Sequence, residues 1–351
     1  MKHWDKPQLR ARSPGKLILS GEHAVVYGKP ALAMAVNCYA ESIISTHLTP
    51  TIFFNLLNLR YARSVTVQTL KILKTRLLED YHEFLQGKQS IRDVLKKPFE
   101  LLQFTVGILI ERLNVTLPHG VEIKASSNIP MGCGMGSSAA TVMSTLHALV
   151  HFFQLQIEPR HYLSLGREAE NLQHGRSSGL DLHLAMSGGA IRFENGQVEK
   201  RDIPNLPLFI VQTGRPSAST GQCVSHVKPY FENNGQGQNL ANDFESVTLA
   251  MDLALQNDNI IDFQEAVRQN HRLLTHVGVV PSKVQSFIKQ TEALGLASKI
   301  CGAGSVTGEN GGILLVAGQE ADKHPLMQKL LTQYGYTIQK VEGDLGGTQI
   351  V

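Results

Sequence analysis

The chain has 351 residues, of which 42% are hydrophobic and 18% charged, and its formal net charge is +3. This composition is that of an ordinary globular protein, and the length favours two closely packed domains over a single core. The small positive charge is scattered along the sequence, which argues against nucleic acid and membrane surfaces as partners.

The cysteines and the first residues indicate the cellular compartment of the protein. Cys38, Cys133, Cys223 and Cys301 have no C-x-x-C spacing, which favours reduced thiols. The first six residues contain no apolar run of the signal-peptide kind, and no segment reaches membrane-spanning length. We therefore expect a cytoplasmic protein.

The N-terminal part of the chain is expected to mix strands and helices. Short apolar runs or alternating patterns predict strands at 17–19, 31–36, 121–124, 189–194, 197–203 and 207–213. Helical spacing of apolar residues predicts helices at 68–86, 90–113, 137–154 and 160–173.

The C-terminal third has a different character. Helices are predicted at 239–255, 259–274, 281–294 and 322–334, with strands at 296–301, 311–317 and 336–342. Gly, Pro, Asn, Ser and Gln accumulate at 214–238, and 231–239 is expected to be a loop. We therefore predict an α+β protein with an N-terminal domain at 1–213 and a C-terminal domain at 214–351.

A glycine-rich segment at 128–140, Asn-Ile-Pro-Met-Gly-Cys-Gly-Met-Gly-Ser-Ser-Ala-Ala, directly precedes a predicted helix. Gly132, Gly134 and Gly136 allow a sharp turn and a close approach to a ligand, while the amides at the helix start favour a phosphate. The hydroxyls of Ser137 and Ser138 could each serve a phosphate oxygen or a magnesium ion. A tight structural turn would also explain the glycines alone. The segment is not a Walker A loop, because no Gly-Lys-Ser/Thr follows.

Two further segments place charged residues beside turns. Lys16 opens a predicted strand, and Glu22 and His23 follow Gly21 in the next turn. Taken alone, these three could equally be solvated or structural. The segment Lys299-Ile-Cys-Gly-Ala-Gly leads a strand into another glycine turn, for which a plain tight turn is the alternative.

A pair of carboxylates lies in the segment 166–189. Glu170 is on a predicted helix, and Asp181 follows a Ser-Ser-Gly turn. One carboxylate could bind a metal while the other accepts a proton. Alternatively, Glu170 is a solvated helix residue and Asp181 caps a helix.

Together the four segments resemble the GHMP kinase superfamily, in the same order and with similar separations along essentially the whole chain. The first segment, with Glu22-His23-Ala24-Val25-Val26, is most similar to the mevalonate kinases. The resemblance implies a two-domain GHMP kinase fold, with an N-terminal ribosomal-protein-S5-like domain that binds ATP and a C-terminal ferredoxin-like α/β sandwich.

The resemblance also implies the reacting groups. Asp181 would orient or deprotonate the attacking hydroxyl, and Lys16 would pair with Asp181 and stabilise the nascent alkoxide and the transferring phosphoryl group. Ser138 and Glu170 would hold Mg²⁺, because Glu170 has the family's spacing of eleven residues before Asp181. This division of work suits phosphoryl transfer, in which positioning and charge neutralisation supply most of the acceleration.

The binding residues follow from the same matches. ATP phosphates would be bound by Gly132, Gly134, Gly136, Ser137, Ser138, Gly302 and Gly304. The acceptor would be bound by Glu22, His23 and Thr220. No motif fixes the adenine pocket, which we expect within 50–110, near Asn55 and Asn58.

The sequence departs from the family pattern in three places. Residues 305–310 lengthen the last glycine turn before Gly311 and Gly312, Leu182 follows Asp181 where mevalonate kinases usually have Asn, and Met135 replaces a commoner Leu. The leucine-to-methionine change conserves volume. The first two departures bear on the acceptor and leave the chemistry as expected.

The leading hypothesis is an ATP-dependent kinase that phosphorylates the primary hydroxyl of mevalonate to 5-phosphomevalonate, in isoprenoid precursor synthesis. The expected partners are ATP, Mg²⁺ and this small alcohol, with a homodimer as a possible assembly. A related kinase for phosphomevalonate, a sugar or homoserine is the alternative, with Arg176 and Arg215 as candidate contacts to a phosphorylated acceptor. A non-catalytic ligand-sensing protein is disfavoured, because such a protein is expected to have lost one of the four reacting residues.

Overall fold

A computed structural model describes residues 8–115, 117, 119–233 and 236–351. The expectation for the first six residues therefore lies outside the described part of the chain, as does the middle of the loop expected at 231–239. Within the described part, no helix has the length and apolar character needed to cross a bilayer.

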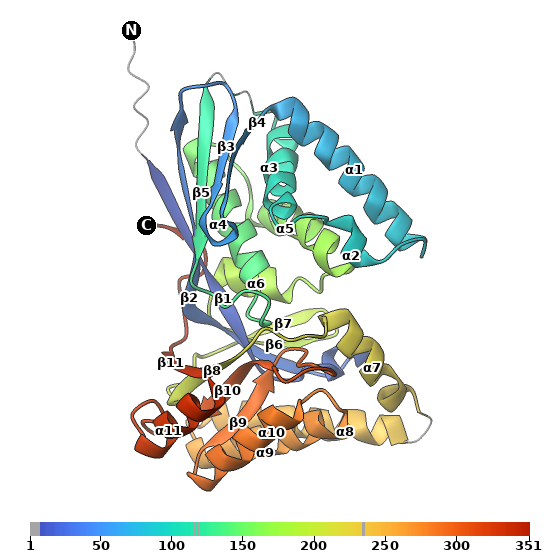
Figure 1. The fold of residues 1–351 in the computed structure, drawn as a ribbon, viewed down its shortest axis with the longest axis vertical. Helices are drawn as coiled ribbons and strands as arrows, with labels where there is room; N and C mark the ends of the chain where they lie inside the picture. The colour runs from blue at the N-terminus through green and yellow to red at the C-terminus, as the bar shows by residue number, and fades with distance from the viewer. Residues whose placement is uncertain (1–7, 116, 118, 234–235) are drawn as a thin grey trace.

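The upper part of the molecule in Figure 1 is built on an eight-stranded sheet. Six strands follow the order β12-β1-β2-β5-β3-β4, and β6 and β7 extend from β2. All pairs are antiparallel except β3 with β5. The strands are β1 (Leu9–Ser20), β2 (Ala31–His47), β3 (Ile52–Leu56), β4 (Tyr61–Val65), β5 (Gly120–Ser127), β6 (Ala190–Glu194), β7 (Gln197–Arg201) and β12 (Gln349–Ile350).

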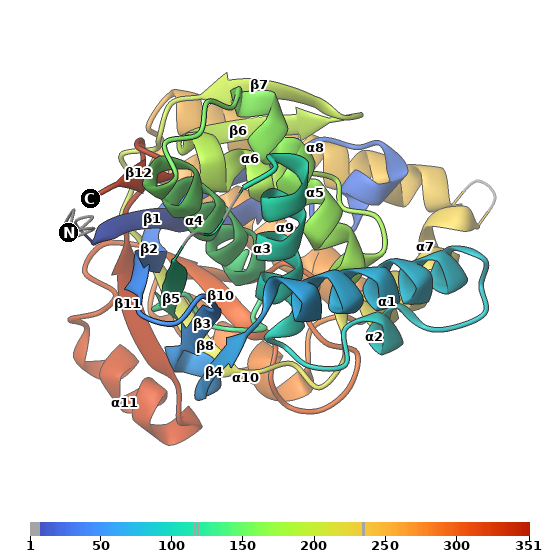
Figure 2. The same ribbon diagram turned by 90° about the horizontal axis from the view of Figure 1, so that it is seen from above.

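Helices pack on one face of this sheet, as Figures 1 and 2 show from two directions. They are α1 (Val67–Leu85), α2 (Ile91–Val94), α3 (Glu100–Arg112), α4 (Ser137–Phe152), α5 (Pro159–His174) and α6 (Leu180–Ser187). Phe54 of β3, Phe104 of α3 and Leu146 of α4 meet in one fully buried apolar cluster. α4 is apolar on most of its surface because α3, α5, α6, β1 and β2 all contact it.

The lower part contains a second, antiparallel sheet in the order β11-β8-β10-β9. Its strands are β8 (Leu208–Gly214), β9 (Ala297–Cys301), β10 (Gly312–Ala317) and β11 (Thr337–Val341). The accompanying helices are α7 (Thr220–Glu232), α8 (Gln236–Gln256), α9 (Ile260–His276), α10 (Ser282–Ala293) and α11 (Pro325–Tyr334). Every residue of β9 and β10 is buried; β10 is apolar throughout, whereas β9 includes Ser298 and Lys299.

The two parts share an apolar cluster. Leu17 of β1 and Met34 of β2 pack in it with Ile210 of β8 and Leu315 of β10. The long strands β1 and β2 therefore serve both parts, and the C-terminal strand β12 returns to pair with β1. The junction between the parts is a packed interior.

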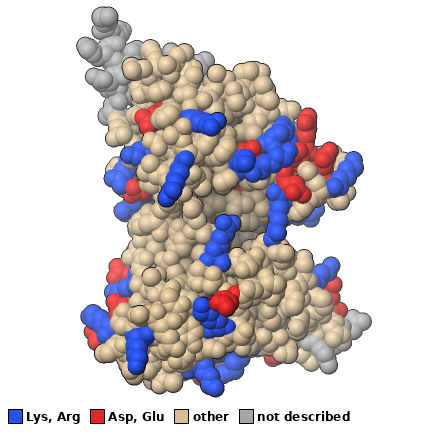
Figure 3. Space-filling view, in the orientation of Figure 1, with Lys and Arg blue, Asp and Glu red and all other residues tan. Residues whose placement is uncertain are grey.

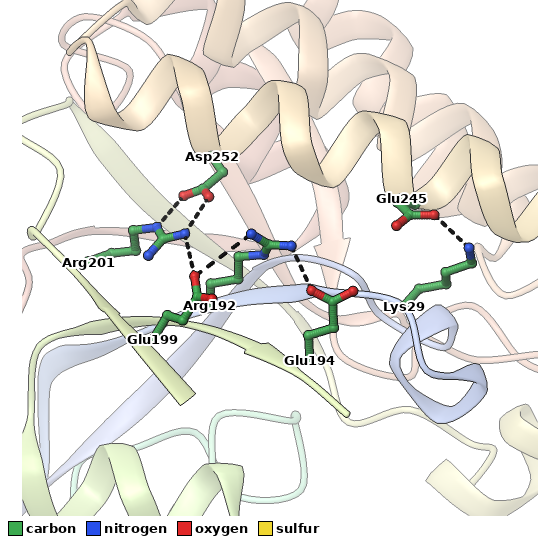
Figure 4. Close-up of polar contacts among 7 residues, drawn as sticks. All are labelled: Lys29, Arg192, Glu194, Glu199, Arg201, Glu245 and Asp252. Atoms are coloured by element: carbon green, nitrogen blue, oxygen red, sulfur yellow. Dashed lines mark hydrogen bonds and ion pairs between the residues drawn. The ribbon is translucent and has the colours of Figure 1, made fainter. Parts of the chain in front are cut away.

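Ion pairs reinforce this junction on the side drawn in Figure 4. Arg201 of β7 donates to both carboxylate oxygens of Asp252 on α8, at 2.8 and 2.9 Å. Lys29 lies 2.6 Å from Glu245 on the same helix. α8 thus belongs to the lower part but is fastened to the upper one.

The predicted α+β class is confirmed, and most elements agree with their expected ranges within a few residues. The prediction of one long helix at 90–113 was wrong, because residues 95–99 separate α2 from α3. This segment includes Pro98, which lacks the amide hydrogen and clashes with the preceding turn of a helix. β1 begins at Leu9 instead of residue 17, and β2 extends to His47 instead of ending at residue 36. The elements α6, β3, β4 and β12 were not predicted.

The segment 214–238 is more ordered than its composition indicates. α7 occupies Thr220–Glu232 and begins with a capping box between Ser219 and Gln222, so the polar residues here start a helix. The loop expected at 231–239 was wrong at both ends, because α7 ends at Glu232 and α8 begins at Gln236. The division into domains at 1–213 and 214–351 stays a prediction. β8, which ends at Gly214, pairs within the second sheet, and β12 pairs within the first.

Candidate active site

Lys16 and Asp181, 165 positions apart in sequence, meet beside the glycine loop. The Lys16 Nζ atom lies 3.2 Å from Asp181 Oδ1, and the two side chains are 8% and 29% exposed. The backbone amide of Lys16 donates to the carbonyl of Met135 at 2.9 Å, which fixes β1 against the loop. Asp181 lies in the first turn of α6, where the helix dipole favours a carboxylate.

Gly136 closes the glycine loop directly against this pair. A Cβ atom at this position would lie 3.1 Å from Lys16 Cγ and 3.4 Å from Asp181 Oδ2. The φ angle of Gly136 is 69°, in the left-handed region that favours glycine. Both the backbone conformation and the proximity of the pair therefore call for glycine here.

The loop ends at the N-terminus of α4. α4 begins at Ser137 with Gly136 as its N-cap, and no side chain caps the helix. Gly132 and Gly134 are exposed, with φ angles of 71° and 85°. An exposed loop that leads into an uncapped helix start presents backbone amides to an anion, as a phosphate site requires.

Glu170 reaches the same place from α5. It is 1% exposed, and its Oε1 atom has no hydrogen-bond partner within the described residues. Its Oε2 atom lies 3.5 Å from His174 Nε2. Burial raises the pKa of this carboxyl and nearby Asp181 adds to the effect, while His174, Ser138 and Lys16 act in the opposite direction.

The setting of Glu170 fits a divalent cation. An unpartnered oxygen of a buried carboxylate costs free energy that a metal would offset. In the described part of the chain, no three His, Cys, Asp or Glu side chains gather to hold a metal. Mg²⁺ suits such a site, because it takes few protein ligands and fills its coordination with phosphates and water. Glu170 and the Ser138 hydroxyl would be those protein ligands.

The turn at 302–304 approaches the glycine loop from the second sheet. A Cβ at Gly134 would lie 3.4 Å from the carbonyl oxygen of Cys301 and 3.8 Å from the Cα of Gly302. Gly304, in contrast, faces the interior, since a Cβ there would lie 2.2 Å from the carbonyl oxygen of Val279. Gly302 thus lies against the loop, whereas Gly304 packs into its own domain.

His23 and Glu22 also bridge the two parts. His23 Nε2 hydrogen-bonds to the carbonyl of Ala303 at 3.1 Å, and burial lowers the pKa of His23 to about 4. Glu22 forms an ion pair with Lys299 of β9, and both side chains are almost fully buried. Lys299 was not among the predicted site residues, although a lysine within a predicted strand, next to Ile300 and Cys301, signals a buried partner.

Two other predicted positions stand apart from the catalytic pair. Thr220 is exposed in the first turn of α7, and no hydrogen bond or ion pair among the described residues joins it to Lys16 or Asp181. Asn58 exchanges two hydrogen bonds with the backbone of Ser127, at 2.9 and 2.7 Å, just before the glycine loop. Figure 3 shows the surface hollowed between the upper and lower parts, with Lys and Arg side chains at the edges.

Comparison with known proteins identifies the family. The GHMP kinases N terminal domain model matches residues 100–189. A mevalonate kinase from Thermococcus onnurineus is 30% identical over 306 residues, which cover 84% of this chain and 86% of that protein. The chain belongs to the mevalonate kinase family of the GHMP kinases.

Other members of the family agree. The mouse mevalonate kinase is 28% identical over 370 residues, covering 93% of this chain and 91% of its own. The Methanococcus jannaschii mevalonate kinase structure superimposes with a TM-score of 0.79 at 22% identity, over 97% of this chain and 99% of that one. Lactococcus lactis galactokinase has a TM-score of 0.74 at 14% identity, over 98% and 95%. These structures confirm the two-domain GHMP kinase fold.

Family membership makes this protein a phosphotransferase that uses ATP. The Lys16–Asp181 pair lies against Gly136 of the glycine loop, and Lys16, Asp181 and Ser138 all act on the pKa of the buried Glu170, so these groups lie together.

Proposed function

We propose that this GHMP kinase transfers the γ-phosphoryl group of ATP to the primary hydroxyl of mevalonate, giving 5-phosphomevalonate for isoprenoid precursor synthesis. The observation that carries the chemistry is the 3.2 Å pair of Lys16 and Asp181 against Gly136. Relatives named mevalonate kinase, at 24–30% identity over most of the chain, support the acceptor.

Asp181 accepts the hydroxyl proton as the new O–P bond forms and the bond to the β-phosphate oxygen breaks, releasing ADP. The ammonium of Lys16 orients the Asp181 carboxylate and neutralises charge on the attacking oxygen. The amides of the glycine loop hold the phosphates at the start of α4. A magnesium ion held by Ser138 and Glu170 would neutralise phosphate charge.

The fold alone does not select the acceptor. Proteins of this fold include a mevalonate kinase solved with R-mevalonate, a galactokinase solved with galactose and a phosphomevalonate kinase solved with phosphomevalonate. Glu22, His23 and Thr220 remain our candidates for acceptor contacts, with Glu22 and His23 fixed next to the 302–304 turn.

An ADP-release assay with Mg-ATP and four acceptors tests the proposal. Mevalonate is expected to support turnover, while phosphomevalonate, galactose and homoserine are not. Turnover with one of the others in place of mevalonate would refute the acceptor and keep the chemistry. ATP binding without turnover on any acceptor would favour a ligand-sensing role.

We also propose that the enzyme works in the cytoplasm as a homodimer, without nucleic acid or membrane partners. The four cysteines are buried and unpaired, as a reducing compartment favours. Light scattering tests the assembly: a mass near 38.5 kDa, that of one chain, would refute the dimer.

A further inference from the structure

Arg215 lies over the glycine loop. Its side chain crosses the face of Gly132, where an added Cβ would lie 3.2 Å from Nε and 3.6 Å from Cδ. The positive charge of Arg215 also acts on Cys133, which follows Gly132: burial raises the pKa of the Cys133 thiol, and Arg215 opposes that rise. Arg215 is exposed, and no carboxylate among the described residues forms an ion pair with it.

The electrostatics at this position favour an anion. The amides of an uncapped helix start already concentrate positive potential at the loop, and the guanidinium adds a full charge. Lys16, a cation that lies beside Gly136, is already paired with Asp181. A phosphate group placed at the loop would be a partner for Arg215, whose planar fork suits phosphate oxygens.

The segment that carries Arg215 is fastened to the lengthened turn at 305–310. Asn310 Nδ2 donates to the carbonyl of Arg215 at 3.4 Å, and its side chain lies against Gly214. Ser305, which is 1% exposed, accepts a hydrogen bond from the amide of Ala218 at 3.1 Å.

Further contacts continue along both segments. The amide of Gly311 donates to the Thr213 hydroxyl at 2.9 Å, and the Thr213 hydroxyl donates to the carbonyl of Gly312 at 2.9 Å. Gly308 packs directly against Ser217. The extra residues therefore bind the exit of β8 at several points instead of projecting into solvent.

We propose that Arg215 contacts a phosphate group of the nucleotide bound at the glycine loop, and that the 305–310 turn holds Arg215 in that position. The additional length of the turn then has a purpose specific to this chain: it braces the segment that delivers the arginine. The inference rests on the proposed kinase function for the identity of the nucleotide, but it concerns binding and not transfer.

The test measures Mg-ADP binding by calorimetry in the absence of any acceptor. Arg215→Gln is expected to weaken binding about tenfold or more, the usual effect of losing a hydrogen bond to a charged group. Arg215→Lys, which keeps the charge, should recover part of the affinity. Binding of adenosine, which has no phosphate, should not change. Arg272→Gln on α9, another exposed arginine, is the matched control.

Asn310→Ala tests the brace. It should weaken Mg-ADP binding in the same direction as Arg215→Gln but by less, with an unchanged melting temperature. Mg-ADP affinity within twofold of wild type in Arg215→Gln would refute the proposal. So would an equal loss for adenosine, or a rise confined to the KM of the acceptor, which would make Arg215 an acceptor contact. Because no acceptor is present, an enzyme inactive on mevalonate would leave this result interpretable.

Discussion

Replacing Asp181 by asparagine separates catalysis from folding at the proposed site. The change keeps the shape of the side chain but removes the proton acceptor, and general bases contribute about 10²–10⁴-fold to a rate. That factor corresponds to about 2.7–5.4 kcal/mol of transition-state free energy, at about 1.36 kcal/mol for each factor of ten.

The cost to stability should be much smaller. The Asp181→Asn substitution would leave the ammonium of Lys16, with its side chain 8% exposed, without a carboxylate at 3.2 Å. Because Asp181 is 29% exposed, water screens the pair and we expect a loss of about 1 kcal/mol, which lowers the melting temperature by about 2–4 °C or less.

The assay is ADP release at saturating Mg-ATP and acceptor, alongside thermal unfolding of the same samples. Asp202→Asn, an exposed aspartate next to β7, is the matched control and should retain wild-type turnover. A kcat for Asp181→Asn within tenfold of wild type would contradict the role of Asp181 as base. A melting temperature lowered by far more than a few degrees would show that the pair is chiefly structural.

Three further changes probe the surroundings of the pair. Glu170→Gln should raise the Mg²⁺ concentration for half-maximal rate about tenfold or more. Because burial raises the pKa of Glu170, the free energy of unfolding falls as pH rises through that pKa. Calorimetry at pH 7 without metal should therefore show a higher melting temperature for Glu170→Gln than for wild type, and a lower one would contradict this. Gly136→Ala should abolish most turnover, because the added Cβ would lie against Lys16 and Asp181. Gly87 has a similar φ of 74° but no atom within 4 Å of an added Cβ, so Gly87→Ala should cost only about 1–2 kcal/mol of backbone strain in urea unfolding. Equal effects of the two variants on turnover would refute the steric argument. The pKa of His23 is about 4 in the folded protein against 6.5 in the unfolded chain. The contribution of His23 to the free energy of unfolding is therefore complete above pH 6.5 and declines by about 2 kcal/mol at pH 5. His23→Asn should lessen the loss of stability between pH 7 and 5 by that amount, and an unchanged loss would contradict this.

Local patterns carried most of what the sequence predicted. Alternating glycines before an apolar helix predicted a turn, and Gly132, Gly134 and Gly136 all have positive φ angles at the start of α4. The apolar run of β10 predicted a strand at 311–317, and every residue of β10 is buried. In each case the signal lies within a few residues of the structure it specifies.

Patterns of half-burial were harder to interpret. β2 continues to His47 with alternating buried and half-buried residues, many of them polar, so the apolar run that signalled its start ends eleven residues early. α7 has an unusual composition for a helix, but its Ser219–Gln222 capping box is a local start signal that the sequence contains. Composition outweighed capping in the prediction, and the capping signal was the better guide.

Long-range partners could not be assigned from one sequence. Nothing near Glu22 indicates that its carboxylate pairs with Lys299, 277 positions later, and nothing near Arg215 indicates that it crosses Gly132. The resemblance to GHMP kinases supplied the Lys16–Asp181 pairing, but residues 305–310 depart from that pattern and had no template. Their contacts with 213–218 came only from the structure.

The junction between the two sheets explains why so much of the site depends on distant residues. β1 contributes Lys16 to the catalytic pair and then ends at Ser20, whose hydroxyl hydrogen-bonds to Thr248 and Asn270 of the lower part. The next turn places Glu22 and His23 on partners in the same part. A displacement of the lower part would therefore pull directly on the strand that positions Lys16. Because a buried charge left without its partner costs several kcal/mol, the Glu22–Lys299 pair opposes such a displacement. The geometry at Asp181 is thus set as much by the packing of the two parts as by the local motifs.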